Sequence, residues 1–235
     1  SLPGTVNVTV NAIPATPTVA SNSPICTGTN LNLTSSGVTG TTTYNWTGPN
    51  SFTSINANPT ISAATTAATG TYNLSVTQNG CTSASSSVSV VVNAVPVISN
   101  PTPSNPTTCA TPTGSITLNG LLSNTAYSVS YTFNSATQTV TITSNASGQV
   151  IISGLASGTY SNITVALNTC ISTAVGPISL SDPNPPATPV ASVLVSPICA
   201  GNTIDLSATS STVGATFTWS GPNSFAATGA TATVT

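Results

Sequence analysis

The 235-residue sequence contains no lysine, arginine, histidine or methionine, and its only acidic residues are Asp182 and Asp205. Without cations the chain has no group that neutralises phosphates, which excludes the usual electrostatic binding of nucleic acids and of anionic membranes. Without histidine, glutamate or lysine it has almost no side chain that carries a proton or binds a metal at neutral pH. We therefore expect no enzyme, no cofactor and no metal site.

The two aspartates offer no substitute for the missing residues. Asp182 precedes Pro183, whereas Asp205 lies between Ile204 and Leu206, in a different part of the chain. Paired-carboxylate catalysis needs two carboxyl groups within roughly 10 Å, and a calcium site needs several oxygen ligands. We expect neither site here.

Long apolar runs are also missing. The longest stretches, such as Val90–Val92, fall far short of the roughly 18 residues that span a bilayer. The start, Ser1-Leu2-Pro3, has neither the basic nor the apolar region of a secretion signal, so we expect any signal to have been removed or to lie outside this stretch. We predict no membrane span in this segment.

Hydroxyl and amide side chains dominate what is present, with 46 threonines, 36 serines and 23 asparagines. The chain is nevertheless 38% hydrophobic and nearly uncharged. Disordered chains are usually poor in β-branched residues and highly charged, whereas an excess of valine, isoleucine and threonine favours strands. The composition therefore predicts an all-β fold.

Internal repeats divide the chain. The segment Ser23-Pro24-Ile25-Cys26 recurs 173 positions later as Ser196-Pro197-Ile198-Cys199, and the same offset places Trp46 on Trp219. A second internal repeat, at an offset of 82 residues, aligns residues 6–14 with residues 88–96. We predict four parts: the last strand of a preceding domain (1–13), a β-sandwich (14–94), a second type of β-sandwich repeat (95–182), and a truncated copy of the first type (183–235).

Proline-rich joints mark the predicted boundaries, at 13–17, 96–112 and 183–189. Such segments favour extended polyproline geometry and act as semi-rigid spacers. We expect the domains to follow one another in an extended array.

Alternating apolar residues predict the strands and the core. Asn79-Gly80 predicts a tight hairpin, and an extra residue after Tyr160 predicts a β-bulge near Asn162. Tyr72 and Tyr160 have the context of tyrosine-corner residues. The aromatic residues predicted to pack in the cores are Tyr44, Trp46, Tyr72, Tyr160, Phe217 and Trp219.

Five cysteines without metal-ligand partners indicate disulfides and an oxidising compartment. Four cysteines allow three pairings, and we predict Cys26–Cys81 and Cys109–Cys170 because each pair stays within one domain. Cys199 is then left over. The 55-residue spacing of Cys26 and Cys81 places its expected partner near position 254, beyond the end of this sequence.

Several of these motifs together resemble a known family. The first and last β-sandwich segments, through 23–28, 44–52, 70–72, 79–81 and 196–225, resemble the Ig-like, PKD-like repeats of giant surface proteins in gliding Bacteroidetes. The middle segment, through Cys109 and 154–160, is similar to the companion repeats of SprB-type adhesins. The resemblance implies export by the type IX secretion system and display on the outer surface as an adhesin or filament shaft.

The leading hypothesis is a structural stalk of an extracellular adhesin or filament, with neighbouring repeats as its partners and mechanical reach as its role. One alternative is a carbohydrate-binding module, in which exposed aromatic residues stack on sugar rings and asparagine and threonine form hydrogen bonds. The resemblance to the family implies glycans or solid surfaces as further partners. Another is a filament subunit that assembles with like chains by strand complementation, because no like charges repel one another.

Overall fold

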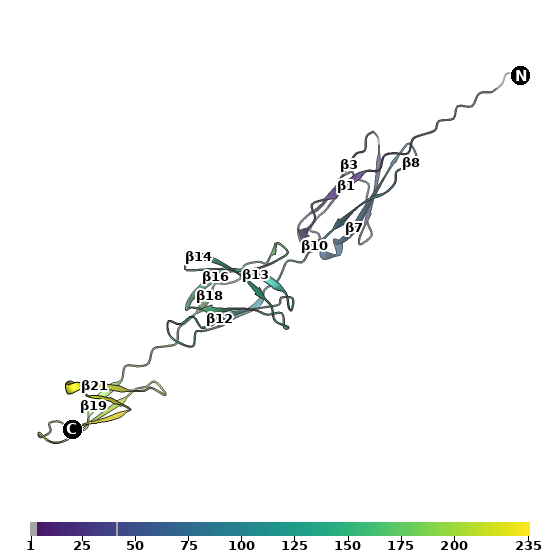
Figure 1. The fold of residues 1–235 in the computed structure, drawn as a ribbon. Helices are drawn as coiled ribbons and strands as arrows, with labels where there is room; N and C mark the ends of the chain where they lie inside the picture. The colour runs from purple at the N-terminus through teal and green to yellow at the C-terminus, as the bar shows by residue number, and fades with distance from the viewer. Residues whose placement is uncertain (1–3, 41) are drawn as a thin grey trace.

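The computed structural model describes residues 4–40 and 42–235. Its strands form three groups that follow one another in a row, with the two termini at opposite ends (Figure 1). We call these groups the first unit (18–93), the second unit (99–180) and the third unit (190–234). Within the described residues, no helix is long and apolar enough to cross a membrane.

Residues 4–13 precede the first unit as an extended, exposed segment that pairs with no strand. This segment belongs to the predicted last strand of a preceding domain, of which residues 1–3 lie outside the described residues. Its valines alternate as they do in a strand, but no described sheet receives them.

The first unit is a sandwich of two sheets. One sheet has the order β1-β3-β6, and the other has the order β5-β4-β7, with β8 and β9 both pairing with β7. A short parallel pair, β10 with β2, closes one end. The elements are β1 (Thr18–Ser21), β2 (Ile25–Cys26), β3 (Leu31–Ser36), β4 (Thr43–Gly48), β5 (Phe52–Ser54), β6 (Thr60–Ile61), the 3-10 helix η1 (Thr66–Ala68), β7 (Gly70–Gln78), β8 (Cys81–Thr82), β9 (Ser86–Val90) and β10 (Val92–Asn93).

The core of the first unit follows from the period of two along each strand. Leu31 and Leu33 point inward from one sheet, and Trp46, Tyr72 and Leu74 point inward from the other; all five are fully buried. Along each strand, these buried residues alternate with hydroxyl and amide residues that face water. The β7–β8 hairpin has positive φ at its two turn residues, as the Asn79-Gly80 dipeptide predicts.

The second unit repeats this topology with different residues. Its sheets have the orders β11-β12-β15 and β14-β13-β16-β17, and β18 also pairs with β16. The predicted β-bulge is confirmed: the register between β13 and β16 shifts opposite Asn162, whose φ is positive. The strands are β11 (Ser99–Ser104), β12 (Gly114–Asn119), β13 (Ala126–Phe133), β14 (Ala136–Thr143), β15 (Val150–Leu155), β16 (Gly158–Leu167), β17 (Cys170–Ile171) and β18 (Ile178–Leu180).

The third unit has a three-stranded sheet, β19-β20-β23, and a two-stranded sheet, β21-β22. At the 173-residue offset these strands correspond to β1, β3, β6, β4 and β5. Residues 190–234 include no strand that corresponds to β7 or β9. The elements are β19 (Val190–Val193), β20 (Ile204–Thr209), β21 (Thr218–Ser220), the 3-10 helix η2 (Pro222–Ser224), β22 (Ala226–Thr228) and β23 (Thr231–Val234).

The strand order identifies the architecture. In the first unit, one sheet contains β1, β3 and β6, and the other contains β4, β5, β7 and β9. This division of the strands between two sheets is the arrangement of Ig-like β-sandwiches. The chain is therefore all-β, with Ig-like sandwiches in tandem, as the sequence predicts.

Candidate functional site

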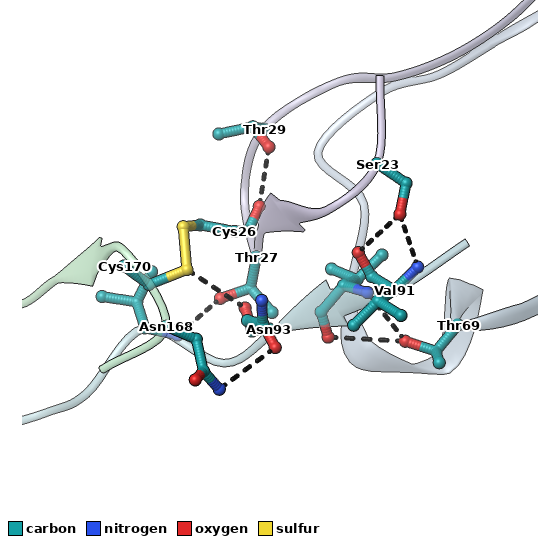
Figure 2. Close-up of a disulfide and its surroundings, with 11 residues drawn as sticks. Ser23, Cys26, Thr27, Thr29, Thr69, Val91, Asn93, Asn168 and Cys170 are labelled. Atoms are coloured by element: carbon teal, nitrogen blue, oxygen red, sulfur yellow. Dashed lines mark hydrogen bonds between the residues drawn. A yellow bond between two sulfur atoms is a disulfide. The ribbon is translucent and has the colours of Figure 1, made fainter. Parts of the chain in front are cut away.

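A disulfide joins the first unit to the second. It connects Cys26, at the end of β2, to Cys170, at the start of β17, across a sequence separation of 144 residues and a Cα–Cα distance of 5.6 Å. Figure 2 shows the bond at the point where the two units meet. Cys170 is almost completely buried, so the bond is part of the junction rather than an exposed link.

Strand β10 holds Cys26 in place. Cys26 is the register partner of Asn93, and the backbone N–H groups of Ile25 and Thr27 donate to the carbonyls of Val91 and Asn93, at 3.1 and 2.9 Å. The chain leaves the first unit immediately after Asn93. Cys26 is therefore fixed beside the exit of the chain toward the second unit.

A tight hairpin presents Cys170 from the other side. Cys170 pairs with Leu167 in the β16–β17 ladder, and the turn residues Asn168 and Thr169 both have positive φ. The Asn168 side-chain amide donates to Asn93 Oδ1 at 3.5 Å, and Cys170 Sγ lies 4.0 Å from the Asn93 backbone oxygen. Asn93 thus contacts the hairpin of the second unit while it pairs with Cys26 of the first (Figure 2).

The remainder of the junction is apolar. The connecting residues 93–97 line a cavity of about 330 Å³ together with Leu121, Leu122, Tyr127 and Leu167 of the second unit. The Tyr127 hydroxyl accepts a hydrogen bond from the Leu122 N–H at 3.0 Å, which fixes this wall. The cavity and the disulfide thus lie at the same short connection between the units.

Both predicted disulfides are wrong, and the topology explains why. Cys26 lies at the end of the first unit that faces the second, whereas Cys81 lies in the β7–β8 hairpin at the opposite end (Figure 1). Cys109 likewise lies beside Pro183, at the far end of the second unit from Cys170. A pair within one unit would have to cross the length of the sandwich, so the pairing runs between units instead.

Three cysteines are unpaired in the described chain, namely Cys81, Cys109 and Cys199. The Cys81 thiol donates to the Asn11 carbonyl at 3.6 Å, and the Cys109 thiol donates to the Pro183 carbonyl at 3.5 Å. Cys199 is exposed in the loop before β20. Cys81 thus lies beside the segment that enters the first unit, and Cys109 lies beside the segment that leaves the second.

The predicted core aromatics fall into two groups. Trp46, Tyr72 and Tyr160 are buried, and Tyr44 is partly buried against the first core. A buried ring offers no platform for a sugar, so the glycan surface considered around Trp46 is absent. The remaining two, Phe217 and Trp219, are partly exposed and line a cavity of about 230 Å³.

The two tryptophans also differ in hydrogen bonding. Trp219 Nε1 donates to the Gly229 carbonyl at 2.9 Å, whereas the buried Trp46 Nε1 has no partner among the described residues.

Tyr72 and Tyr160 are tyrosine-corner residues, as predicted. Their hydroxyls donate to the carbonyls four residues earlier, of Ala68 at 2.9 Å and Ala156 at 3.0 Å. Burial raises the pKa of the Tyr72 phenol above its ordinary value. Burial also raises the pKa of Tyr160, and nearby Tyr131 raises it further by a smaller amount. The hydrogen bond to Ala156 acts in the opposite direction and lowers this pKa.

The aspartates act as local hydrogen-bond acceptors. Asp182, just after the second unit, accepts from the Ser157 hydroxyl at 2.9 Å, and Asp205 of the third unit accepts from the Thr233 hydroxyl at 2.9 Å. Within the described residues, no group of three or more cysteine or acidic side chains gathers as a metal site.

No protein-family model matches the chain, and no curated protein matches it. Among solved structures, it is similar to a chain in the crystal structure of a mouse coronavirus receptor-binding domain complexed with its murine receptor, at 16% identity, 71% of this chain, 99% of that chain and a TM-score of 0.43. It is also similar to murine CEACAM1b, at 17% identity over 71% of this chain and 99% of that chain, with a TM-score of 0.42. A third similar structure is a two-domain fibronectin type-III segment of chicken tenascin, at 15% identity over 71% of this chain and 98% of that chain, with a TM-score of 0.37.

Proposed function

We propose that the chain is a stalk segment of an extracellular adhesin or surface filament, which acts mechanically and without catalysis. The observation that carries the proposal is the disulfide across the first junction, because it links two sandwiches that already stand in a row (Figure 1). A disulfide persists in an oxidising compartment, which supports a location outside the cell. The sequence resemblance to SprB-type adhesins, and with it type IX secretion, supports the same role.

The disulfide changes how tension travels along the chain. When the two ends are pulled, the covalent path passes from Cys26 directly to Cys170 through the S–S bond. Residues 27–169 lie inside the closed loop, so they do not lengthen the chain even if both units unfold. Roughly 140 residues at about 3.5 Å each make this hidden length on the order of 500 Å. The bond therefore limits how far the first and second units can lengthen under load.

Single-molecule pulling of the full chain, tethered at its two ends, tests the proposal. The oxidised chain should lack the extension of about 500 Å that the reduced chain releases when the first and second units unfold. Cys26→Ala should behave as the reduced chain under oxidising conditions, and Cys109→Ala, a matched control at an unpaired cysteine, should behave as the oxidised one. Equal total extension in both redox states would contradict the mechanical role.

A carbohydrate-binding role finds less support. The full burial of Trp46 removes one of the two aromatic sites, and only the partly exposed pair Phe217 and Trp219 remains. We therefore retain the stalk as the proposed function.

A further inference from the structure

The disulfide between the first and second units joins two kinds of cysteine (Figure 2). Cys26 lies in the loop between β1 and β3, beside the segment through which the chain leaves its unit, and we call it an exit-loop cysteine. Cys170 lies in the hairpin after the longest strand of its unit, beside the segment through which the chain enters, and we call it an entry-hairpin cysteine. Cys109 and Cys81 occupy the same two kinds of position.

Cys109 is the exit-loop cysteine of the second unit. It lies between β11 and β12, the first two strands of their three-stranded sheet, as Cys26 lies between β1 and β3. The Cys109 thiol donates to the Pro183 carbonyl at 3.5 Å, and in the same loop Asn105 Oδ1 accepts from the Ser181 N–H at 3.0 Å. Both of these partners follow the last strand of the second unit. Cys109 is therefore held beside the outgoing chain, as Cys26 is in the first unit.

Cys81 is the entry-hairpin cysteine of the first unit. Like Cys170, it is the first residue after a two-residue turn with positive φ, and it pairs with the last residue of the long preceding strand. In both units the serine two residues later accepts from the backbone N–H of a strand valine, at 3.1 Å in the first unit and 3.0 Å in the second. The first unit thus has a hairpin of the same local geometry as the one that forms the observed bond.

The surroundings of the two hairpin sulfurs also repeat. Cys170 Sγ lies 4.0 Å from the Asn93 carbonyl oxygen, and Cys81 Sγ lies 3.6 Å from that of Asn11. The 82-residue repeat aligns Asn11 with Asn93, and Asn93 is the register partner of Cys26. Cys81 therefore contacts the counterpart of the residue that stands beside an exit-loop cysteine.

The order of the units gives the partner expected for Cys109. At the 173-residue offset the third unit corresponds to the first, so a unit of the first type follows the second. The same offset carries the hairpin cysteine, Cys81, to position 254. That position is 145 residues from Cys109, whereas the observed bond spans 144 residues. The two links have nearly the same spacing along the chain.

We propose that the bond between Cys26 and Cys170 is one link of a series, in which the exit-loop cysteine of each unit bonds to the entry-hairpin cysteine of the next unit of the same polypeptide. Cys109 bonds to the hairpin cysteine of the first-type unit that follows it, and Cys81 bonds to the exit-loop cysteine of a unit that precedes the first. The proposal rests on the stalk function and extends it, because each junction then limits extension as the first one does.

The chemistry of each link is an oxidation of two thiols. Two S–H bonds break and one S–S bond forms. The two electrons and two protons pass to a small-molecule disulfide such as oxidised glutathione, which becomes two thiols.

An exchanged chain tests the link at Cys109. A second copy of residues 17–94, a sandwich with its own core, replaces residues 190–235 and follows the native connection 181–189. Cys81→Ser in the original first unit leaves the copied hairpin cysteine, at position 254, as the only one of its type. After treatment with oxidised glutathione, pepsin peptides should show Cys109 joined to this cysteine. One thiol should remain per chain, and two should remain when Cys109→Ser is added.

A matched variant separates a placed thiol from a merely accessible one. In the copied unit, Cys81→Ser combined with Thr82→Cys moves the thiol by one residue, to the opposite face of the strand. The bond to Cys109 should then be lost.

A reversed arrangement tests the link at Cys81 and keeps the test decisive if the exchanged unit does not fold. A copy of residues 95–189 replaces residues 1–16, with Cys109→Ser in the original second unit, and the copied Cys109 should bond to Cys81. The proposal is overturned if Cys109 remains a thiol in both chains, if it bonds to another cysteine, or if the shifted thiol bonds equally well. These outcomes leave the pulling experiment unchanged, because it depends on Cys26 and Cys170 alone.

Discussion

Removal of the junction disulfide should destabilise both units that it connects. We consider the double variant Cys26→Ala/Cys170→Ala, since alanine leaves no hydroxyl in the buried Cys170 position. If the first unit unfolds while the second stays folded, the loop closed by the bond runs from Cys26 to about Asn93, roughly 70 residues. The chain-entropy relation gives about 4 kcal/mol for a loop of this length.

The complete unfolding of both units gives a slightly larger value. The closed loop then spans the full separation of 144 residues, and the same relation gives about 5 kcal/mol. A domain of the size of the first unit shifts its midpoint by about 4–8 °C per kcal/mol. When the first unit unfolds alone, the variant should therefore melt roughly 15 °C or more below the oxidised wild type.

Differential scanning calorimetry of the oxidised chain and the variant measures this shift, with Cys109→Ala as the control that should melt as the wild type does. Bridged peptides should be mapped after pepsin digestion, because the chain has no lysine or arginine for trypsin. A double variant that melts within 2 °C of the wild type, or a map that joins Cys26 to Cys81, would refute the reasoning.

Three further predictions concern the cores. Gly48→Ala should destabilise the first unit by about 1–3 kcal/mol in urea unfolding, because the new Cβ would lie 2.4 Å from Cδ1 of Tyr72, whereas Gly4→Ala, with no atom within 4 Å, should change nothing. The free energy of unfolding should fall as pH rises above about 10. Burial raises the pKa of Tyr72 in the folded chain, so the tyrosine loses its proton at a lower pH in the unfolded chain, which favours unfolding. Urea midpoints that stay level from pH 9 to 12 would contradict this. Acrylamide should quench the emission of Trp219 more strongly than that of buried Trp46, measured in variants that keep one tryptophan each, and equal quenching would count against the burial difference.

Local signals predicted much of the fold, because they act over a few residues. The alternation in 31–33 and 72–76 requires only that each strand bury one face. The hairpin at Asn79-Gly80 and the bulge at Asn162 depend on backbone angles that asparagine and glycine adopt readily. The tyrosine corners follow from hydroxyls that reach four residues back along the same chain.

The candidate site was harder to predict because it depends on which ends of the sandwiches meet. Nothing in the spacing of Cys26 and Cys81 shows that an antiparallel topology sends them to opposite ends of one unit. The repeat aligns Asn11 with Asn93, but only the structure shows that each lies beside a hairpin cysteine.

Composition and neighbouring residues are sufficient to predict the strand content, the turns, the tandem order and the absence of charged chemistry. The structure was needed to establish that Cys26 bonds to Cys170, that Trp46 is buried while Trp219 is partly exposed, and that residues 5–12 lie unpaired. The physical reason is the same in each case. Contacts between distant residues depend on how complete sheets pack and on which of their ends come together, and no local pattern encodes either.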